Sequence, residues 1–147
     1  MLTTITALAL AIDVRTCSYN PESLNVRSNP KAGFKIAQVS SADDGARSYS
    51  GAIDGAPFKL SADICTAFNV EAVVTVPKGK QAQSIQLIGH LLDRLGVVVG
   101  GVRLTPAEQK QLKSSGEVTV NRGVMHRIYH YKVEPGGAVT IVANFIE

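Results

Sequence analysis

The sequence has no tryptophan, and only 5% of its 147 residues are aromatic. Charged residues make up 18% and apolar residues 45%, which excludes a disordered polar chain and predicts one globular domain with an aliphatic core. No apolar run approaches the ~20 residues of a membrane-spanning helix, so we expect no membrane partner. The formal charge of +3 is a mild basic excess, which is compatible with a nucleic-acid partner but not diagnostic of one.

Cysteine is also scarce. Cys17 and Cys65 lie in no C-x-x-C spacing and have no cluster of histidines, so we expect no zinc site. The two cysteines could form a disulfide if their strands are neighbours. The interpretation that we favour is two buried free thiols. The chain begins without the basic region of a signal peptide, and we interpret residues 2–14 as a first strand.

Motifs that carry catalysis are missing as well. The chain has no G-x-S-x-G, no P-loop and no dinucleotide fingerprint, so we expect no enzyme activity and no cofactor. His126 and His130 share one face of a predicted strand, but no carboxylate pattern accompanies them, and we expect no metal. Four aspartates, Asp43, Asp44, Asp54 and Asp63, keep a small α+β hydrolase or isomerase as an alternative. Turn chemistry explains the first three of them.

The strongest pattern is in residues 68–95. A strand over 68–76 has apolar residues on alternate positions, and Pro77 and Gly79 end it. From residue 81 the period changes to that of a helix over 81–95. Its apolar ridge must lie on a sheet, which belongs either to the same chain or to a partner subunit. The residues of this ridge are Ile85, Ile88, Leu91, Leu92 and Leu95.

The remaining elements follow from alternation and turn signals. Residues 34–40, 47–53 and 58–65 read as strands, with Asp54-Gly55 as a hairpin turn between the last two. A capping box, Thr105 to Glu108, starts a second helix over 106–114. Strands at 117–120, 124–133 and 138–146 complete the chain. We therefore predict a single α+β domain, residues 1–147, with a mainly antiparallel sheet, strands in 2–76 and 117–146, and two helices packed on one face.

A nucleic-acid surface is the best candidate for a site. If the strands between residues 34 and 76 form one sheet, one face collects positive charge for phosphates, a ring for base stacking and an amide for a base edge. These predicted RNA-binding residues are Lys35, Arg47, Tyr49, Lys59 and Asn69. Arg127 and Tyr129, with Tyr131 on the same face, form a second cluster. The alternative is the ordinary solvated face of a one-sided sheet.

A family resemblance supports this interpretation. Residues 74–77, Val-Thr-Val-Pro, followed by the helical stretch 84–92 and a shorter helix at 105–114, resemble the coat proteins of single-stranded RNA bacteriophages. The resemblance covers about 50 residues and its motif is degenerate. It implies a homodimer whose two sheets join edge to edge, helices that cross onto the partner, an inner sheet face that binds single-stranded RNA, and dimers that build an icosahedral capsid. It also implies a place in the virion, with assembly in the host cytoplasm.

The chain departs from that family at its C-terminus. About 30 residues with a strand pattern follow the helices, whereas the part before residue 68 is short for the usual hairpin plus sheet. A permuted topology, in which the C-terminal strands replace or join the N-terminal hairpin, would account for both. Two alternatives stay open beside the coat protein. One is another phage virion subunit, such as a tail or decoration protein without an RNA role, and the other is the small α+β enzyme.

Overall fold

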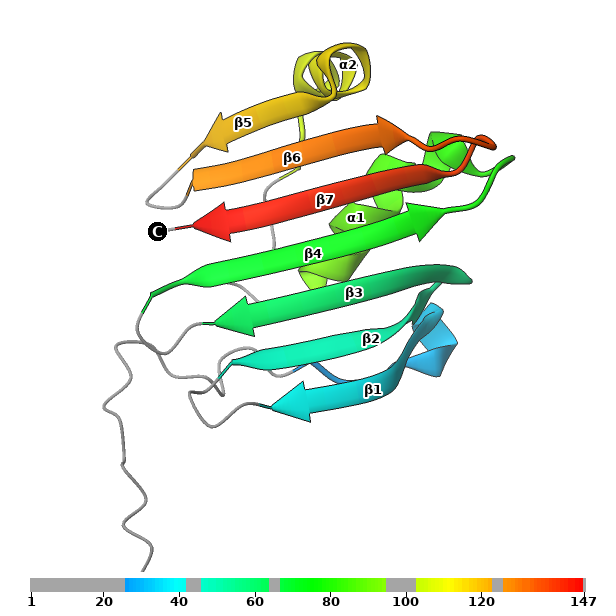
Figure 1. Ribbon diagram of the computed structural model, residues 1–147, viewed down its shortest axis with the longest axis vertical. Coiled ribbons are helices and arrows are strands. Elements are labelled where there is room, and N and C mark those ends of the chain that lie inside the picture. Colours follow the sequence, from blue (N-terminus) through cyan, green and yellow to red (C-terminus); the bar gives the residue numbers. More distant parts are fainter. Residues whose placement is uncertain (1–25, 42–45, 64–66, 95–102, 123–125, 147) are drawn as a thin grey trace, which may run out of the picture.

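The computed structural model describes residues 26–41, 46–63, 67–94, 103–122 and 126–146. The described chain forms one seven-stranded sheet in the order β1-β2-β3-β4-β7-β6-β5 (Figure 1). All six pairings are antiparallel, which confirms the predicted fold class. The strands are β1 Phe34–Ser41, β2 Arg47–Ile53, β3 Ala56–Asp63, β4 Asn69–Val76, β5 Glu117–Asn121, β6 His126–Val133 and β7 Val139–Ile146.

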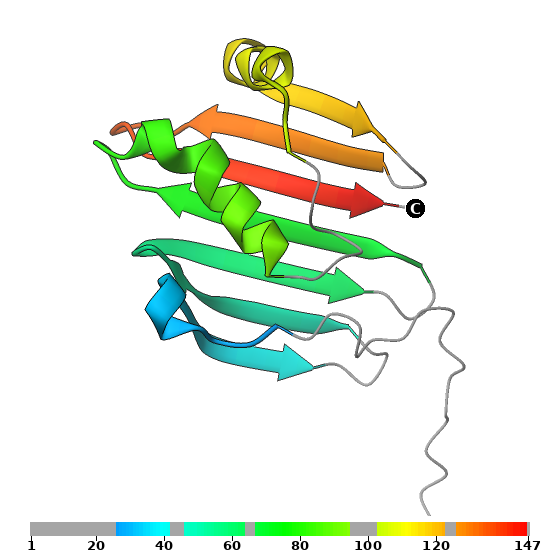
Figure 2. The same cartoon turned by 180° about the vertical axis from the view of Figure 1, so that it is seen from behind.

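The helices lie between β4 and β5 in the chain. The short 3-10 turn η3, Gln81–Gln83, runs directly into α1, Ser84–Asp93, and α2 spans Pro106–Ser115; a further 3-10 turn, η2 at Pro30–Ala32, precedes β1. Figure 2 shows α1 crossing β4 and β7 on one face of the sheet, while α2 lies beside β5 and β6 at one end. The described part of the chain contains no helix that is long and apolar enough to cross a membrane.

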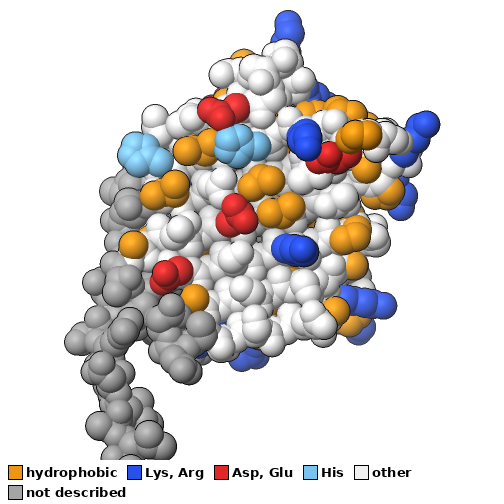
Figure 3. Space-filling view, viewed as in Figure 1, with side chains coloured by type: hydrophobic (Ala, Val, Ile, Leu, Met, Phe, Trp, Pro, Cys, Tyr) orange, Lys and Arg blue, Asp and Glu red, His pale blue; other side chains and the backbone are white. Residues whose placement is uncertain are grey.

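Buried and exposed side chains alternate along the strands, so that one face of the sheet lines the core. In β3, Phe58 and Leu60 are buried and Lys59 is exposed, and β4 and β7 repeat the pattern. Side chains on alternate positions of a strand point to opposite faces, so each strand gives one row to the core and one to the other side. We call the side under α1 the covered face and the opposite side, seen in Figure 3, the open face.

The first hairpin sets the register of this half of the sheet. Asp54 and Gly55 both have positive φ, 48° and 80°, as a two-residue hairpin turn requires. The turn pairs Ile53 with Ala56. Because register in an antiparallel pair fixes which residues share a face, Tyr49 lies opposite Leu60, and the whole odd-numbered row of β2 joins the covered face.

The C-terminal strands join the main sheet. β7 pairs with β4 along its full length, from Asn69 opposite Ile146 to Val76 opposite Val139. β6 and β5 then extend the sheet from β7. The strand that precedes the helices, β4, is thus paired on both sides, with β3 and with β7. The predicted first strand at 2–14, and Cys17 and Cys65, lie outside the described residues.

The prediction that a partner subunit covers the apolar ridge of the first helix is wrong for the described residues at its centre. Ile88, Leu91 and Leu92 are 1%, 0% and 3% exposed in the single chain, because α1 packs on β4 and β7 of its own sheet. Ile85 is only partly buried, and Leu95 lies outside the described residues. The described centre of the ridge, Ile88, Leu91 and Leu92, is therefore covered by the chain's own sheet without a second copy.

The capping box of the second helix is present as predicted. Thr105 Oγ1 accepts a hydrogen bond from the backbone N–H of Glu108 at 3.2 Å, and Glu108 Oε2 accepts one from the backbone N–H of Thr105 at 2.7 Å. Pro106 occupies the first helical position, where its missing N–H costs nothing. Gly116 ends the helix with φ of 80°. Leu112, fully buried, is the residue through which α2 joins the core.

Candidate functional site

A shallow hollow lies on the open face over β1 to β4. Its volume is about 780 Å³, and Lys35 and Lys59 contribute the two charged side chains of its lining. An adjoining hollow of about 630 Å³ continues toward the far ends of the same strands. No carboxylate is among the described residues that line either one. We call the two together the open-face hollow; apart from Tyr49, whose side chain belongs to the covered face, the polar uncharged residues in its lining are Gln38, Ser40, Ser48, Ser50, Ser61 and Thr75.

The register explains why these side chains meet. Lys59 of β3 lies opposite Ser50 of β2 on one side and Val73 of β4 on the other. Lys35 of β1 lies opposite Ala52. These residues all take the strand positions that face away from α1. The hollow is thus a place where two lysines stand among small hydroxyl side chains, on a sheet face that neither described helix covers.

Three of the predicted RNA-binding residues lie on this face. Lys35 and Lys59 line the hollow. Asn69 is exposed on the same face, but it lies at the far end of β4, where it pairs with Asp63 and Ile146. Asn69 therefore stands next to a carboxylate and outside the hollow. The role of all three in RNA binding stays a prediction.

The predicted placement of Arg47 and Tyr49 on that face is wrong. Both occupy the odd-numbered row of β2, which the hairpin register assigns to the covered face. Tyr49 is only 8% exposed and packs in the core. Its ring cannot stack on a base from the open side. The expectation failed because it added polar residues from several strands without fixing which alternate positions share a face.

The second predicted cluster is also inside. Arg127 and Tyr129 are 6% and 2% exposed, and they do share a face with Tyr131, but it is the covered face. The Arg127 guanidinium carbon lies 5.7 Å from the ring centre of Phe145, and Arg127 Nη1 donates to the carbonyl of Arg122 at 3.3 Å. Burial raises the pKa of the Tyr129 hydroxyl. Arg127 and Tyr129 are therefore packed in the interior and are not exposed to solvent.

Sequence reasoning missed the hydroxyl residues of the hollow. Ser48 and Ser50 alternate with Tyr49 and Gly51 in β2, and Ser61 follows Leu60 in β3. A strand that alternates serine with core residues signals a polar row on one face. Fixing the register from the Asp54-Gly55 turn would have grouped these serines with Lys59.

The rest of the open face carries both signs of charge. Its strands bear three lysines and three carboxylates among the described residues, namely Lys35, Lys59, Lys132, Asp63, Glu71 and Glu117 (Figure 3). At the β5–β6 end, His130 Nδ1 lies 3.3 Å from Glu117 Oε2. His126 Nδ1 lies 2.8 Å from Asn121 Oδ1. Lys132 pairs with Glu134 at 3.0 Å, so the open-face lysines without an ion pair among the described residues are those of the open-face hollow.

The two predicted strand histidines take ordinary polar partners. Among the residues that the structure describes, no three His, Cys, Asp or Glu side chains are grouped so that they could hold a metal ion. His90 on α1 is far from both in the chain, and its Nδ1 lies 3.8 Å from Asp54 Oδ2 in the first hairpin turn. The described part of the chain therefore offers no cluster of side chains for a metal ion.

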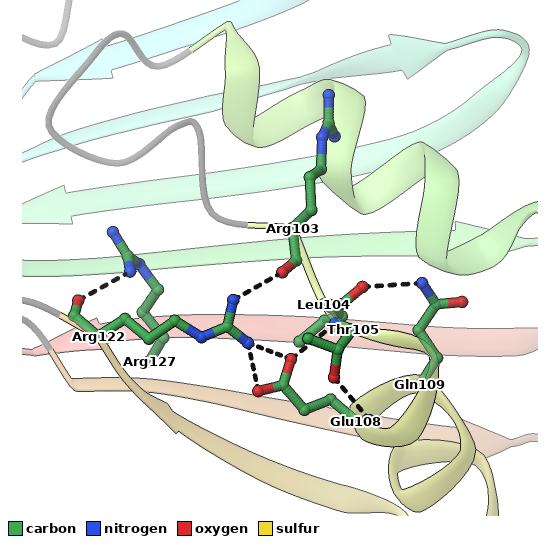
Figure 4. A network of polar contacts seen from close by, with 7 residues as sticks. All are labelled: Arg103, Leu104, Thr105, Glu108, Gln109, Arg122 and Arg127. Atoms are coloured by element: carbon green, nitrogen blue, oxygen red, sulfur yellow. Dashed lines mark hydrogen bonds and ion pairs between the residues drawn. The ribbon is translucent and has the colours of Figure 1, made fainter.

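A polar network ties the start of α2 to the end of β5 (Figure 4). The Arg122 guanidinium pairs with the Glu108 carboxylate and also donates to the Arg103 carbonyl at 3.1 Å. This arginine holds the pKa of Glu108 below its usual range, with help from the Thr105 backbone. Arg103 turns the other way and pairs with Asp93 of α1. The network joins the loop before α2 to both helices and is structural in character.

A groove of about 300 Å³ lies between the two helices on the covered side. Its floor is apolar, from Ile85, Ile88 and Leu104, and Arg103 and Lys113 are at its margin. This groove and a neighbouring hollow over α2, which Lys110 and Lys113 line, also have positive side chains and no carboxylate in their described lining. The groove lies on the opposite side of the sheet from Lys35 and Lys59.

Comparisons with known proteins give no relative. No family model matches the chain, and neither a curated protein nor a solved structure is significantly similar to it.

Proposed function

We propose that this protein is the coat subunit of a single-stranded RNA virus, which assembles into a shell and packages RNA against the open face of its sheet. The open-face hollow is the observation that carries the proposal. It places two lysines and a group of hydroxyl side chains on a bare sheet surface, where an extended polyanion has room to lie. The resemblance of residues 74–114 to phage coat proteins supports the same proposal from the sequence.

Exposed apolar side chains support assembly. Val39, Val133 and Ile146 are 58%, 61% and 45% exposed. They lie at three separate places on the rim of the sheet: on edge strand β1, at the end of β6 and at the end of β7 (Figure 1). A shell subunit must contact neighbours in several directions, and apolar side chains at the rim favour such contacts. The expected dimer that exchanges helices is not part of the proposal, because α1 covers its own sheet.

Electron microscopy and light scattering of the purified full chain test the proposal. We expect particles with an absorbance ratio at 260 and 280 nm that indicates nucleic acid, and RNA that ribonuclease does not reach in intact particles. Val39→Thr with Val133→Thr should weaken assembly and leave the circular dichroism spectrum unchanged. A stable monomer that forms no particles at any concentration or ionic strength would overturn the proposal.

One observation favours a second candidate. The strands of the open face carry equal numbers of described lysines and carboxylates, so the face as a whole does not attract a polyanion. A virion subunit without an RNA role, such as a tail or decoration protein, fits that balance. Regular assemblies with the absorbance ratio of pure protein would identify this candidate.

A further inference from the structure

We propose that the open-face hollow holds the sugar–phosphate backbone of single-stranded RNA and does not read its bases, so that packaging is independent of sequence. This inference rests on the proposed function, because it takes RNA as the occupant. It adds the mode of recognition, which follows from the kinds of side chain that the register brings to each face.

The two lysines are free to take phosphates. Lys35 and Lys59 are both exposed, and neither has an ion-pair partner among the described residues. They lie two strands apart and two residues apart along the strands, which places their Cα atoms about 12 Å from each other by standard sheet spacing. Two ammonium groups at that separation can each take a phosphate of one strand that crosses β1 to β3.

The uncharged lining suits sugar and phosphate. Ser48, Ser50 and Ser61 present hydroxyl groups, which both donate and accept, so they can bind phosphate oxygens or ribose hydroxyls. Val73 and Pro57 add apolar surface without directional preference. A Gln38 amide is also present, and it can donate or accept at any base edge. Among these groups Gln38 is the one with an amide that can pair with a base edge, and no second base-reading side chain from the described lining stands beside it.

The tyrosine and phenylalanine rings that could stack on bases are on the other side, and the open-face histidines, His126 and His130, lie at the β5–β6 end, outside the hollow. Tyr49 and Tyr129 are buried in the core, and Tyr131 is partly buried against it. Phe34 and Phe58 stack on each other at 5.1 Å between ring centres, also in the core. Sequence-specific recognition of single-stranded RNA relies on bases stacked on such rings and held at their edges. The described aromatic side chains are thus committed to the fold.

Two consequences are measurable. A change in the contacts to phosphates alters the binding affinity for all RNA sequences to the same extent, whereas contacts to bases discriminate between sequences. Neutralising two phosphates of a single strand gives log K against log salt concentration a slope of about −1.4. Removal of both lysines should therefore reduce the measured slope by about that amount.

The test compares two double variants with equal charge change. Lys35→Gln with Lys59→Gln removes two charges from the hollow, and Lys110→Gln with Lys113→Gln removes two from α2 on the opposite side. Binding of oligo(A), oligo(C) and oligo(U) of equal length is measured by fluorescence anisotropy over a series of salt concentrations. Thermal unfolding confirms that both variants are folded.

The expected result has three parts. The wild type binds the three oligonucleotides with affinities within about threefold of each other, the hollow variant loses at least about tenfold for all three, and the α2 variant stays near the wild type. A preference of more than about tenfold for one oligonucleotide, abolished in the hollow variant, would overturn backbone recognition and leave RNA packaging standing. Loss of affinity in the α2 variant alone would show that RNA binds on the helix side, and it would also overturn the proposal. Particles that form while no oligonucleotide binds would instead refute the RNA role itself.

Discussion

Val74 of β4 lies directly opposite Ile141 of β7, and both side chains are fully buried beneath α1. The strand that leads into the first helix is thereby paired with the last strand of the same chain. A helix that crosses this junction holds the two halves of the sheet together. Since β4 is paired on both sides, the outer strands of the described sheet are β1 and β5.

Leu91→Ala tests whether α1 belongs to its own sheet. Leu91 is fully buried, so we expect its truncation to lower the free energy of unfolding by about 2–5 kcal/mol. Because the contact lies within one chain, the loss should be equal at protein concentrations about 100-fold apart. Urea denaturation measures both. Gln86→Ala, on the exposed side of α1, is the control and should change the free energy by less than about 0.5 kcal/mol. A loss that grows on dilution would show that a second copy covers the ridge.

Gly51→Ala tests the close approach of β1, β2 and Phe58. A Cβ at this position would lie 1.9 Å from the Lys35 carbonyl oxygen and 2.9 Å from Phe58 Cε1. Either β1 or the stacked pair of Phe34 and Phe58 must then move, so we expect a loss of about 1–3 kcal/mol in free energy of unfolding. Ser48→Ala, on the exposed face of the same strand, is the matched control. Equal stability of the two variants would show that β1 shifts without cost.

The local elements of this fold were predictable because their signals are local. The Asp54-Gly55 turn, the alternation of β3 and β4 and the capping box at Thr105 each depend on residues close in sequence. All three were predicted correctly. The helix over 81–95 was also found, although it begins as the 3-10 turn Gln81–Gln83 and the described α-helix ends at Asp93.

The faces and the long-range pairing were not predictable in the same way. Tyr49 and Arg127 look like surface residues by type, and only register shows that they point inward. In β1, an irregularity between Ile36 and Gln38 shifts the alternation once more. The pairing of β4 with β7 joins residues that are between 63 (Val76 and Val139) and 77 (Asn69 and Ile146) positions apart, and no local pattern encodes it. The predicted face was therefore right for Lys35 and Lys59 and wrong for the two tyrosine rings, and the role of the lysines in RNA binding stays a prediction.

Glu108→Gln tests the polar network through its pH dependence. Arg122 keeps the pKa of Glu108 in the folded chain below the value of an unfolded glutamate. The unfolded state thus takes up the proton first, so this stabilisation is present above about pH 4.5 and is lost as the pH falls through the lower folded pKa. We expect the variant to be about 1 kcal/mol less stable at pH 7 and the difference to shrink toward pH 3. Denaturant titrations over this pH range measure it.

The partner variant separates the two contributions of Glu108. Once Arg122→Gln has removed the guanidinium, Glu108→Gln should cost less than it does in the wild type, since only the capping contact with Thr105 is left. Equal costs in both backgrounds, or a difference that does not change with pH, would contradict the assigned role of Arg122.

Arg127→Met tests whether the buried guanidinium is needed for the fold. Its Nε has no hydrogen-bond partner, and no carboxylate pairs with it among the described residues; the Phe145 ring and one carbonyl are its recorded partners. A buried charge with so few partners carries a desolvation cost that an apolar side chain of similar length avoids. We expect the methionine variant to be as stable as the wild type or up to about 2 kcal/mol more stable. Urea denaturation measures the change.

Oligonucleotide binding by the same variant decides where RNA lies. Arg127 is on the covered face, whereas Lys35 and Lys59 are on the open face, so Arg127→Met should leave binding and its salt dependence unchanged. Arg127→Lys keeps the charge but lacks the planar guanidinium that stacks on Phe145, and it should be the less stable of the two variants. Weaker binding by the methionine variant, with unchanged stability, would mean that RNA reaches the covered side of the sheet. A stability loss above about 2 kcal/mol would mean that the guanidinium anchors β6 to β7.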